Sequence, residues 1–156
     1  MSGGTPFQSS IRFESERVRA AAIYCSDGRL GEQFDEFLHQ ALRLPRYDRL
    51  AVPGGAASLA GHFQTYREAD GLLEQLRFLV DVHQLEQVVL IAHEGCAYYT
   101  NRLKVSPLQL ETQQQQDFRK ALQRVQRLGR HVRVRGYFAR LLAGGTVRFE
   151  EVLRSD

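Results

Sequence analysis

Short apolar runs alternate along the chain with longer segments in which apolar residues recur every three or four positions. Five runs predict β-strands, at residues 17–24, 47–52, 88–92, 132–138 and 146–152. Three amphipathic stripes between these runs predict helices that begin near Leu30, Leu72 and Phe118. The third run is apolar throughout, which indicates a strand buried on both faces of a sheet.

The connections between these elements contain turn-forming residues. Pro45 ends the first helix, and Pro53-Gly54-Gly55 predicts a sharp turn after the second strand. Residues 56–63 predict a helical or irregular segment, and Asp70-Gly71 leaves open whether a helix continues through it. Gly144-Gly145 predicts a hairpin, which makes the fifth strand antiparallel to the fourth.

Strands that alternate with helices predict an α/β fold of three layers. Helices cover both faces of a central, mostly parallel sheet, and the fifth strand joins one edge in the antiparallel direction. Residues 1–15 predict an N-terminal tail or arm and residues 16–156 a single domain, because this length suits one core and no repeat is visible. In open sheets of this kind, ligands bind beyond the carboxyl ends of the strands.

Composition narrows the class of protein. Hydrophobic residues at 43% and charged residues at 25% are ordinary for a soluble globular domain. No apolar run approaches the ~20 residues of a membrane span, and residues 1–10 lack the basic start and apolar stretch of a secretory signal. We therefore expect a cytoplasmic protein without a membrane partner.

The net charge of +3 is too small to require a polyanionic partner. Seven basic residues nevertheless gather in one region: Arg119, Lys120, Arg124, Arg127, Arg130, Arg133 and Arg135. Interleaved aromatic residues, which are typical of nucleic-acid surfaces, are missing there. We interpret the region as a solvated helix face followed by an exposed strand edge and expect no nucleic-acid partner.

Two predicted strands end in residues with metal-binding or catalytic chemistry. The segment Cys25–Arg29, with the sequence CSDGR, follows the first strand, and His93–Cys96, with the sequence HEGC, follows the third. Two cysteines and one histidine are ligands that zinc prefers, and three ligands leave one position open. If the two strands are neighbours, these side chains meet at one edge of the sheet. A disulfide is disfavoured in a reducing cytosol.

Asp27 and Arg29 lie two positions apart, where their side chains can point the same way and form a bidentate pair. Arg29 would hold Asp27 ionised and oriented. Asp27 can then accept a hydrogen bond from hydroxide on the zinc, or bind as the fourth ligand and close the site. A lone cysteine is often an apolar filler and an Asp-Arg pair often a helix cap. Their joint occurrence at two strand ends favours the metal site.

The two segments together resemble the β-class carbonic anhydrases. CSDGR is similar to the Cys-x-Asp-x-Arg motif of that family, and HEGC is similar to its His-x-x-Cys motif. The order and separation of these motifs fit, as do Gly54-Gly55 and the hairpin at Gly144-Gly145, so the resemblance covers residues 17–152. It implies parallel strands in the order 2-1-3-4.

The resemblance also implies a site and an activity. Zinc would be bound by Cys25, His93 and Cys96, with Asp27 and Arg29 as the catalytic dyad. The reaction would be the reversible hydration of carbon dioxide to bicarbonate, catalysed by a zinc-dependent lyase. The basic unit would be a homodimer or a higher homo-oligomer.

Several positions depart from the family pattern. Ala92 and Ala97 stand where glycine usually flanks the His-x-x-Cys motif, and residues 51–55 lack the usual Arg and Asn. The long helical N-terminal arm is mostly missing. Two alternatives with the same fold therefore stay open: a zinc-binding protein without hydratase activity, and a hydrolase of carbon disulfide or carbonyl sulfide.

A cysteine hydrolase or phosphatase is the main alternative from another class. A phosphatase loop requires five residues between its cysteine and arginine, whereas three separate Cys25 from Arg29. A Cys-His nucleophile pair would leave Cys96 without a purpose. His93-Glu94 resembles the start of a metalloprotease motif, but Cys96 and Ala97 stand where a second histidine should come.

The remaining histidines and the tyrosines beside the motifs are weaker candidates. His39, His83 and His131 are expected at the surface, and His62 could approach the site. A second set of residues is expected to pack in the core or line the pocket: Tyr24, Tyr98 and Tyr99.

Overall fold

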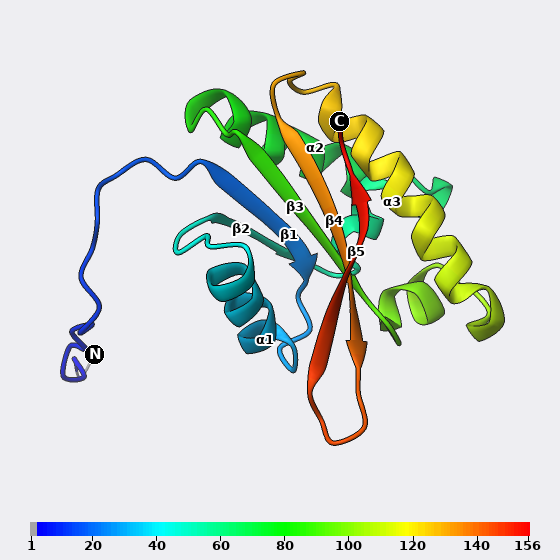
Figure 1. The fold of residues 1–156 in the computed structure, drawn as a ribbon, viewed down its shortest axis with the longest axis horizontal. Helices are drawn as coiled ribbons and strands as arrows, with labels where there is room; N and C mark the ends of the chain where they lie inside the picture. Colours follow the sequence, from blue (N-terminus) through cyan, green and yellow to red (C-terminus); the bar gives the residue numbers. More distant parts are fainter. Residues whose placement is uncertain (1–2) are drawn as a thin grey trace.

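Residues 3–156 are described by a computed structural model, in which five strands form one sheet in the order β2-β1-β3-β4-β5 (Figure 1). The strands are β1 Ala20–Cys25, β2 Asp48–Val52, β3 Gln87–His93, β4 Arg133–Leu141 and β5 Val147–Arg154. The first four run parallel, and β5 runs antiparallel to β4. The predicted α/β class, strand order and antiparallel edge strand are confirmed.

The helical elements follow the predicted stripes but are more broken than expected. They are α1 Gly31–Glu36, the π-helical turn η1 Phe37–Ala41, the 3₁₀ turns η2 Gly55–Leu59 and η3 Phe63–Thr65, α2 Tyr66–Val82, the π-helical turn η4 Tyr98–Arg102, the 3₁₀ turn η5 Pro107–Gln109, and α3 Leu110–Gln126. The first predicted helix is therefore a short α-helix that widens into a π-helical turn. The second continues through Asp70 and Gly71, because Ala69, Leu72 and Leu76 form one buried stripe.

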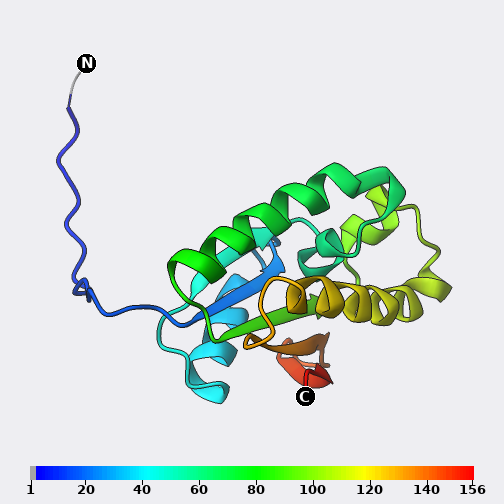
Figure 2. The same ribbon diagram turned by 90° about the horizontal axis from the view of Figure 1, so that it is seen from above.

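The helices cover both faces of the sheet, as predicted. Figure 2 shows α2 and α3 on one side of the strands and α1 on the other. On the α2–α3 side, Leu76 of α2 and Phe118 of α3 pack on Val88 and Leu90 of the sheet. On the α1 side, Phe34 packs beneath the strands. β3 is therefore buried on both faces of the sheet, as its apolar run indicated.

The first strand begins at Ala20, three residues later than predicted. Its parallel partner β3 begins at Gln87, which pairs with Ala20. One residue earlier, Arg19 is still held at this edge, because its carbonyl accepts a hydrogen bond from the backbone N–H of Glu86 at 2.8 Å. Arg17 and Arg19 turn outward and form ion pairs with Glu86. β1 therefore starts at the first residue that pairs with β3.

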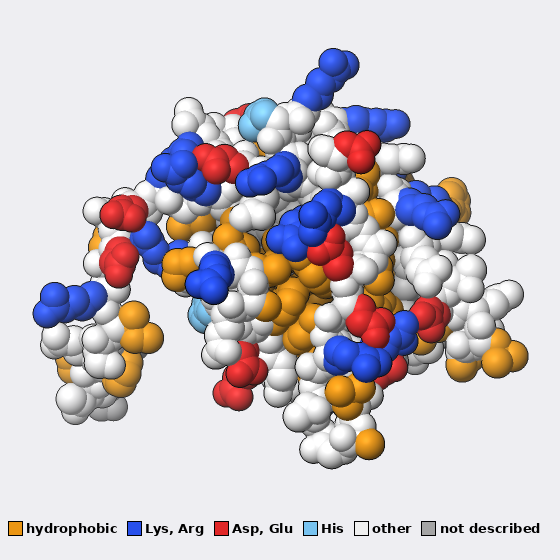
Figure 3. Space-filling view, viewed as in Figure 1, with side chains coloured by type: hydrophobic (Ala, Val, Ile, Leu, Met, Phe, Trp, Pro, Cys, Tyr) orange, Lys and Arg blue, Asp and Glu red, His pale blue; other side chains and the backbone are white. Residues whose placement is uncertain are grey.

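Residues 3–19 contain no helix or strand and extend away from the domain (Figures 1 and 2). Large apolar side chains lie exposed along this tail: Phe7, Ile11 and Phe13. Figure 3 shows a second group of hydrophobic side chains between α1 and β5, surrounded by interspersed basic and acidic residues. Among the helices of residues 3–156, none has both the length and the apolar character needed to cross a bilayer.

Candidate metal centre

The carboxyl ends of β1 and β3 lie side by side, which brings the two sequence motifs together. The strands are parallel neighbours, with Ile23 opposite Leu90. Both therefore end at the same edge of the sheet, β1 at Cys25 and β3 at His93. Three residues later, a turn through Gly95 at a φ of 66° returns the chain to Cys96.

The possible ligand atoms of Cys25, His93 and Cys96 all lie within 4.8 Å of one another. His93 and Cys96 are buried, whereas Cys25 is partly exposed, and both cysteines are free thiols. The structure therefore brings these three side chains together at one edge of the sheet. Two sulfurs and one imidazole nitrogen at such separations can hold one tetrahedral metal ion with a position left over.

The orientation of the His93 ring fits a metal ligand. Its Nδ1 lies 2.8 Å from the carbonyl oxygen of Glu94, an arrangement in which Nδ1 carries the proton and donates it. Its Nε2 is buried and has no hydrogen-bond partner among residues 3–156. A buried nitrogen without a partner is costly, and a histidine fixed by a carbonyl at one nitrogen is the usual metal-binding form at the other. The ring is thus prepared to bind through Nε2.

The two thiols affect each other's ionisation. A hydrogen bond from Cys96 lowers the pKa of the Cys25 thiol, and the neighbouring His93 side chain acts in the same direction against the effect of burial. The same contact with Cys25, together with burial, raises the pKa of Cys96. Of the two thiols, Cys25 is therefore the one that ionises more readily. A thiolate is the form of cysteine that binds a metal.

A glycine pair after β2 lets another segment approach the strand ends closely. Gly54 and Gly55 have φ values of 80° and 54°, the left-handed region that favours glycine. A β-carbon on Gly55 would lie 2.8 Å from the backbone nitrogen of Cys25 and 3.0 Å from the carbonyl oxygen of Ile91. The turn predicted from Pro53-Gly54-Gly55 therefore packs η2 directly against the candidate centre.

Asp27 and Arg29 form the predicted bidentate pair. The guanidinium donates from Nη2 to Oδ2 of Asp27 at 2.7 Å and from Nε to Oδ1 at 3.0 Å. The side chain of Asp27 also accepts the backbone N–H of Arg29, as in the turns that aspartate commonly forms. These hydrogen bonds lower the pKa of Asp27 to about 2. Its carboxylate is therefore ionised and fixed.

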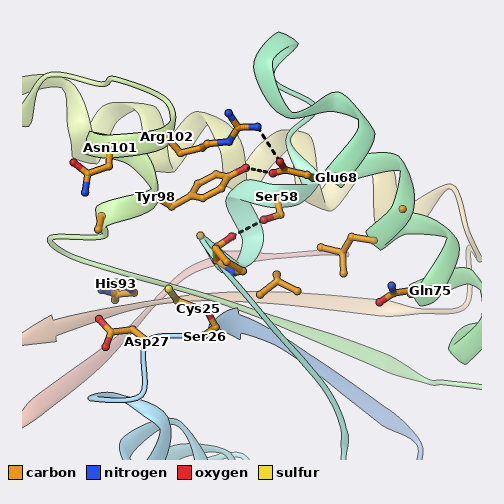
Figure 4. Close-up of a pocket in the computed structure, with 16 residues that line it drawn as sticks. Cys25, Ser26, Asp27, Ser58, Glu68, Gln75, His93, Tyr98, Asn101 and Arg102 are labelled. Atoms are coloured by element: carbon orange, nitrogen blue, oxygen red, sulfur yellow. Dashed lines mark hydrogen bonds and ion pairs between the residues drawn. The ribbon is translucent and has the colours of Figure 1, made fainter.

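A pocket of about 860 Å³ opens in front of these groups. Cys25, Asp27 and His93 lie at one end, and Tyr98, Glu68 and Arg102 lie on the facing side (Figure 4). Glu68 accepts hydrogen bonds from the Tyr98 hydroxyl at 3.1 Å and from Arg102 at 2.9 Å. Apolar side chains form much of the remaining lining, beside the polar Ser26, Ser58, Gln75 and Asn101: Val52, Pro53, Leu72 and Ala97. The pocket thus joins a reactive end to a largely apolar wall.

The weaker candidates fall on different parts of the fold. Tyr98 lines the pocket, whereas Tyr24 packs against Phe34 on the other face of the sheet. His62 is not among the pocket residues, and its Nε2 lies 2.8 Å from Asp117. His39 and His131 are exposed as expected, but His83 is half-buried because it pairs with Asp48 at 2.6 Å. The predicted basic region is largely solvent-exposed.

Sequence reasoning missed the polar residues that reach the site from helices. Glu68 and Arg102 line the pocket, and Gln114 and Asp117 are buried beneath the turn between His93 and Tyr99. Glu68, Gln114 and Asp117 stand in or beside amphipathic stripes, and Arg102 ends the short turn η4; polar residues at such positions are normally solvated. Only the position of Gln114 and Asp117 next to Phe118, on the apolar side of α3, could have indicated burial.

Two solved structures and one sequence relative are similar to this chain. The β-carbonic anhydrase isoform I of Trichomonas vaginalis superposes with a TM-score of 0.57 at 12% identity, over 90% of this chain and 87% of that one. The β-carbonic anhydrase CafA of Aspergillus fumigatus gives a TM-score of 0.45 at 15% identity, over 86% and 76% of the two chains. An uncharacterised protein of Rickettsia conorii is 24% identical over 94 residues, which cover 60% of this chain and 49% of that relative.

A family model also matches most of the chain. The family model described as "Putative carbonic anhydrase" matches residues 15–145, and this range includes both motifs and the first four strands together with the hairpin turn. The similarity to the Trichomonas structure independently gives the β-carbonic anhydrase fold. The chain therefore belongs to this carbonic anhydrase family.

Proposed function

We propose that this protein is a zinc-dependent carbonic anhydrase that hydrates carbon dioxide reversibly to bicarbonate. One observation supports this most directly: the sulfurs of Cys25 and Cys96 and the imidazole of His93 lie within 4.8 Å of one another, with Nε2 buried and unpartnered within the described chain. An ionised carboxylate held by an arginine, Asp27, stands beside this cluster. Family membership makes carbon dioxide the first substrate to test.

Cys25, His93 and Cys96 would hold the zinc ion. When bound, zinc supplies Lewis-acid activation of a water molecule. Two thiolates donate more charge than two imidazoles, so water needs further help in losing its proton. The carboxylate of Asp27 would accept a hydrogen bond from this water molecule. Arg29 keeps that carboxylate ionised and in a fixed orientation.

The pocket would receive carbon dioxide along its apolar wall, at Val52, Leu72 and Ala97. Attack of the water oxygen on the carbon, with loss of one proton to solvent, turns carbon dioxide and water into bicarbonate and H⁺. The reverse reaction uses the same groups. Asp27 favours the orientation in which the O–H group of bicarbonate faces its carboxylate. A carboxylate accepts a hydrogen bond from O–H and repels an oxygen that carries a negative charge.

Metal analysis and hydration kinetics test the proposal together. Wild-type protein purified without chelator should contain one zinc per chain, and Cys25→Ser should lose it. Stopped-flow measurement with a pH indicator should then show carbon dioxide hydration by the wild type only. A cysteine hydrolase would retain activity without metal, so activity in zinc-free protein would reject the zinc mechanism. A trace equal to the uncatalysed rate across a range of pH would reject the hydratase.

A second candidate keeps the same zinc site and changes the substrate. The largely apolar lining of the pocket suits carbon disulfide or carbonyl sulfide, which are uncharged and less polar than water. Hydrolysis of either would release hydrogen sulfide. A sulfide-specific assay on zinc-loaded protein distinguishes this activity from hydration, and absence of both activities would leave a zinc-binding protein without catalysis.

Location and assembly belong to the same proposal. The two free thiols support a reducing compartment such as the cytoplasm. A homodimer or higher homo-oligomer is the assembly that the family resemblance implies. Light scattering of the zinc-loaded protein should give a mass of at least twice that of one chain, whereas a monomeric mass would contradict this part.

A further inference from the structure

Helix α3 places two buried polar side chains beneath the segment that joins His93 to Tyr99. Gln114 and Asp117 lie three positions apart, so they are neighbours on one face of the helix. Each is only 1% exposed. The same side of α3 contributes Phe118, Ala121 and Val125 to the core. Two polar residues inside an apolar stripe cost free energy unless they make specific contacts.

Gln114 contacts the first residue of this segment. Its Nε2 donates a hydrogen bond to the carbonyl oxygen of His93 at 2.8 Å. The orientation of the amide is determined by this contact, because a carbonyl can accept only from the NH₂ end. Gln114 therefore fixes the backbone of His93 at the point where β3 ends.

Asp117 contacts the other end of the segment. Its Oδ2 accepts a hydrogen bond from the Tyr99 hydroxyl at 2.8 Å and lies 2.8 Å from Nε2 of His62. Its Oδ1 accepts from Gln113 at 3.0 Å. A buried carboxylate with three such neighbours is well satisfied and is confined to one position. Tyr99 in turn donates its backbone N–H to the carbonyl of Cys96 at 3.2 Å.

The two contacts bracket both candidate metal ligands on this segment. Gln114 holds the backbone at His93, and Asp117 acts through Tyr99 on the turn that starts at Cys96. The separation between the imidazole and the Cys96 sulfur therefore depends on α3. Apolar packing alone would not select one position along the helix, whereas directional hydrogen bonds do.

We propose that Gln114 and Asp117 are positioning residues that set the metal affinity of the site by holding the turn between His93 and Cys96. This inference rests on the metal binding in the proposed function, but it does not require hydratase activity. Residues that orient metal ligands through hydrogen bonds typically contribute about 10- to 100-fold to metal affinity. An effect of that size is expected here.

The test compares variants that remove one contact and keep the volume. Tyr99→Phe deletes the hydroxyl that reaches Asp117, and Gln114→Met deletes the donor to His93. Tyr137→Phe is the matched control, because Tyr137 also donates its hydroxyl to a carboxylate, that of Glu151 at 3.2 Å, on the opposite face of the sheet. Zinc affinity is measured by competition with a chromophoric chelator. The visible spectrum of the cobalt(II)-substituted protein reports the ligand geometry.

Tyr99→Phe and Gln114→Met should each weaken zinc binding about 10-fold or more and change the cobalt spectrum, while Tyr137→Phe changes neither. A purely structural role would lower the melting temperature of the metal-free protein and leave the zinc affinity of the folded protein unchanged. If both variants bind zinc within about fivefold of wild type, the inference is wrong. If Gln114→Met does not fold, Asp117→Asn and Tyr99→Phe decide the question.

The outcomes separate this inference from the proposed function. A wild-type protein that binds zinc but hydrates no carbon dioxide contradicts the proposed function and leaves the positioning role testable and intact. A wild-type protein that binds no zinc overturns both. Normal hydration with unchanged zinc affinity in both variants overturns the positioning role alone.

Discussion

Arg29 donates four hydrogen bonds to the carboxylate of Asp27, three from its guanidinium and one from its own backbone N–H, across only two positions of chain. The arginine side chain is itself 84% exposed, whereas Asp27 is 19% exposed. The hydrogen bonds therefore fix the position of the Asp27 carboxylate, whereas most of the Arg29 side chain stays in solvent. The purpose of the pair in the proposed mechanism is to keep one oxygen atom ionised and directed at the reacting water.

Asp27→Asn should leave zinc bound and reduce turnover by about 10²- to 10⁴-fold. The amide is similar in size, but its NH₂ group cannot accept the hydrogen bond of the water, and the contribution of a positioned proton acceptor is of that order. Zinc content and stopped-flow hydration of the same sample check the two parts. Turnover equal to that of the wild type would remove Asp27 from the mechanism.

Arg29→Ala should release Asp27 from its hydrogen bonds and let the carboxylate move onto the metal. Turnover falls because the fourth coordination position is then closed. A crystal structure of the zinc-loaded variant would show the new contact directly. Arg29→Lys is the matched comparison: it keeps the positive charge but lacks the two parallel donors, so we expect it to lose most of the activity as well. Full activity in Arg29→Lys would mean that charge alone suffices.

Gly55→Ala should destabilise the protein strongly. A positive φ costs a residue with a side chain about 1–3 kcal/mol, and the new β-carbon would also press on backbone atoms of Cys25 and Ile91, which have little room to move. Urea unfolding measures the loss. Gly71→Ala in α2 is the control, because no atom beyond its chain neighbours and the backbone of its own helix lies within 4 Å of its β-carbon position, and alanine there should stabilise by about 0.5–1 kcal/mol. Equal effects would contradict the close approach.

Glu151→Gln should reduce stability near neutral pH and matter less in acid. Hydrogen bonds from Arg154 and Arg135 lower the pKa of Glu151 to about 2, against a usual value of 4.5. A carboxylate whose pKa is lower in the folded state stabilises fully above the unfolded value, and this contribution disappears as the pH falls through the folded value. The difference between variant and wild type should therefore shrink between pH 4.5 and 2.

Urea unfolding of both proteins at several pH values measures this difference. Glu32→Gln is the control, since Glu32 makes no ion pair within the described residues. Its difference from wild type should stay small throughout the range. A Glu151→Gln difference that is constant or grows in acid would contradict the ion-pair account.

The strands and the three converging side chains could be predicted because they depend on local patterns. A continuous apolar run such as Val88–Ala92 indicates a buried strand, and motifs at the ends of two parallel strands meet at one edge if the strands are neighbours. The bidentate contact between Asp27 and Arg29 followed from a spacing of two residues. Each of these predictions needs little information from elsewhere in the chain.

The polar contacts from helices could not be predicted in this way. The hydrogen bond between Gln114 and His93 joins residues 21 positions apart, and the contact between His62 and Asp117 spans 55 positions. Such pairs depend on how α3 lies across the sheet, which no local period specifies. The same holds for the start of β1, which depends on where β3 begins.

β1 and β3 are both inner strands, each with a strand bonded on either side. Their backbones are therefore among the last to open when the protein is heated, after the tail and the tip of the β4–β5 hairpin have frayed. Dissociation of a metal held at their ends would accordingly coincide with melting of the sheet, and one cooperative transition would report both events.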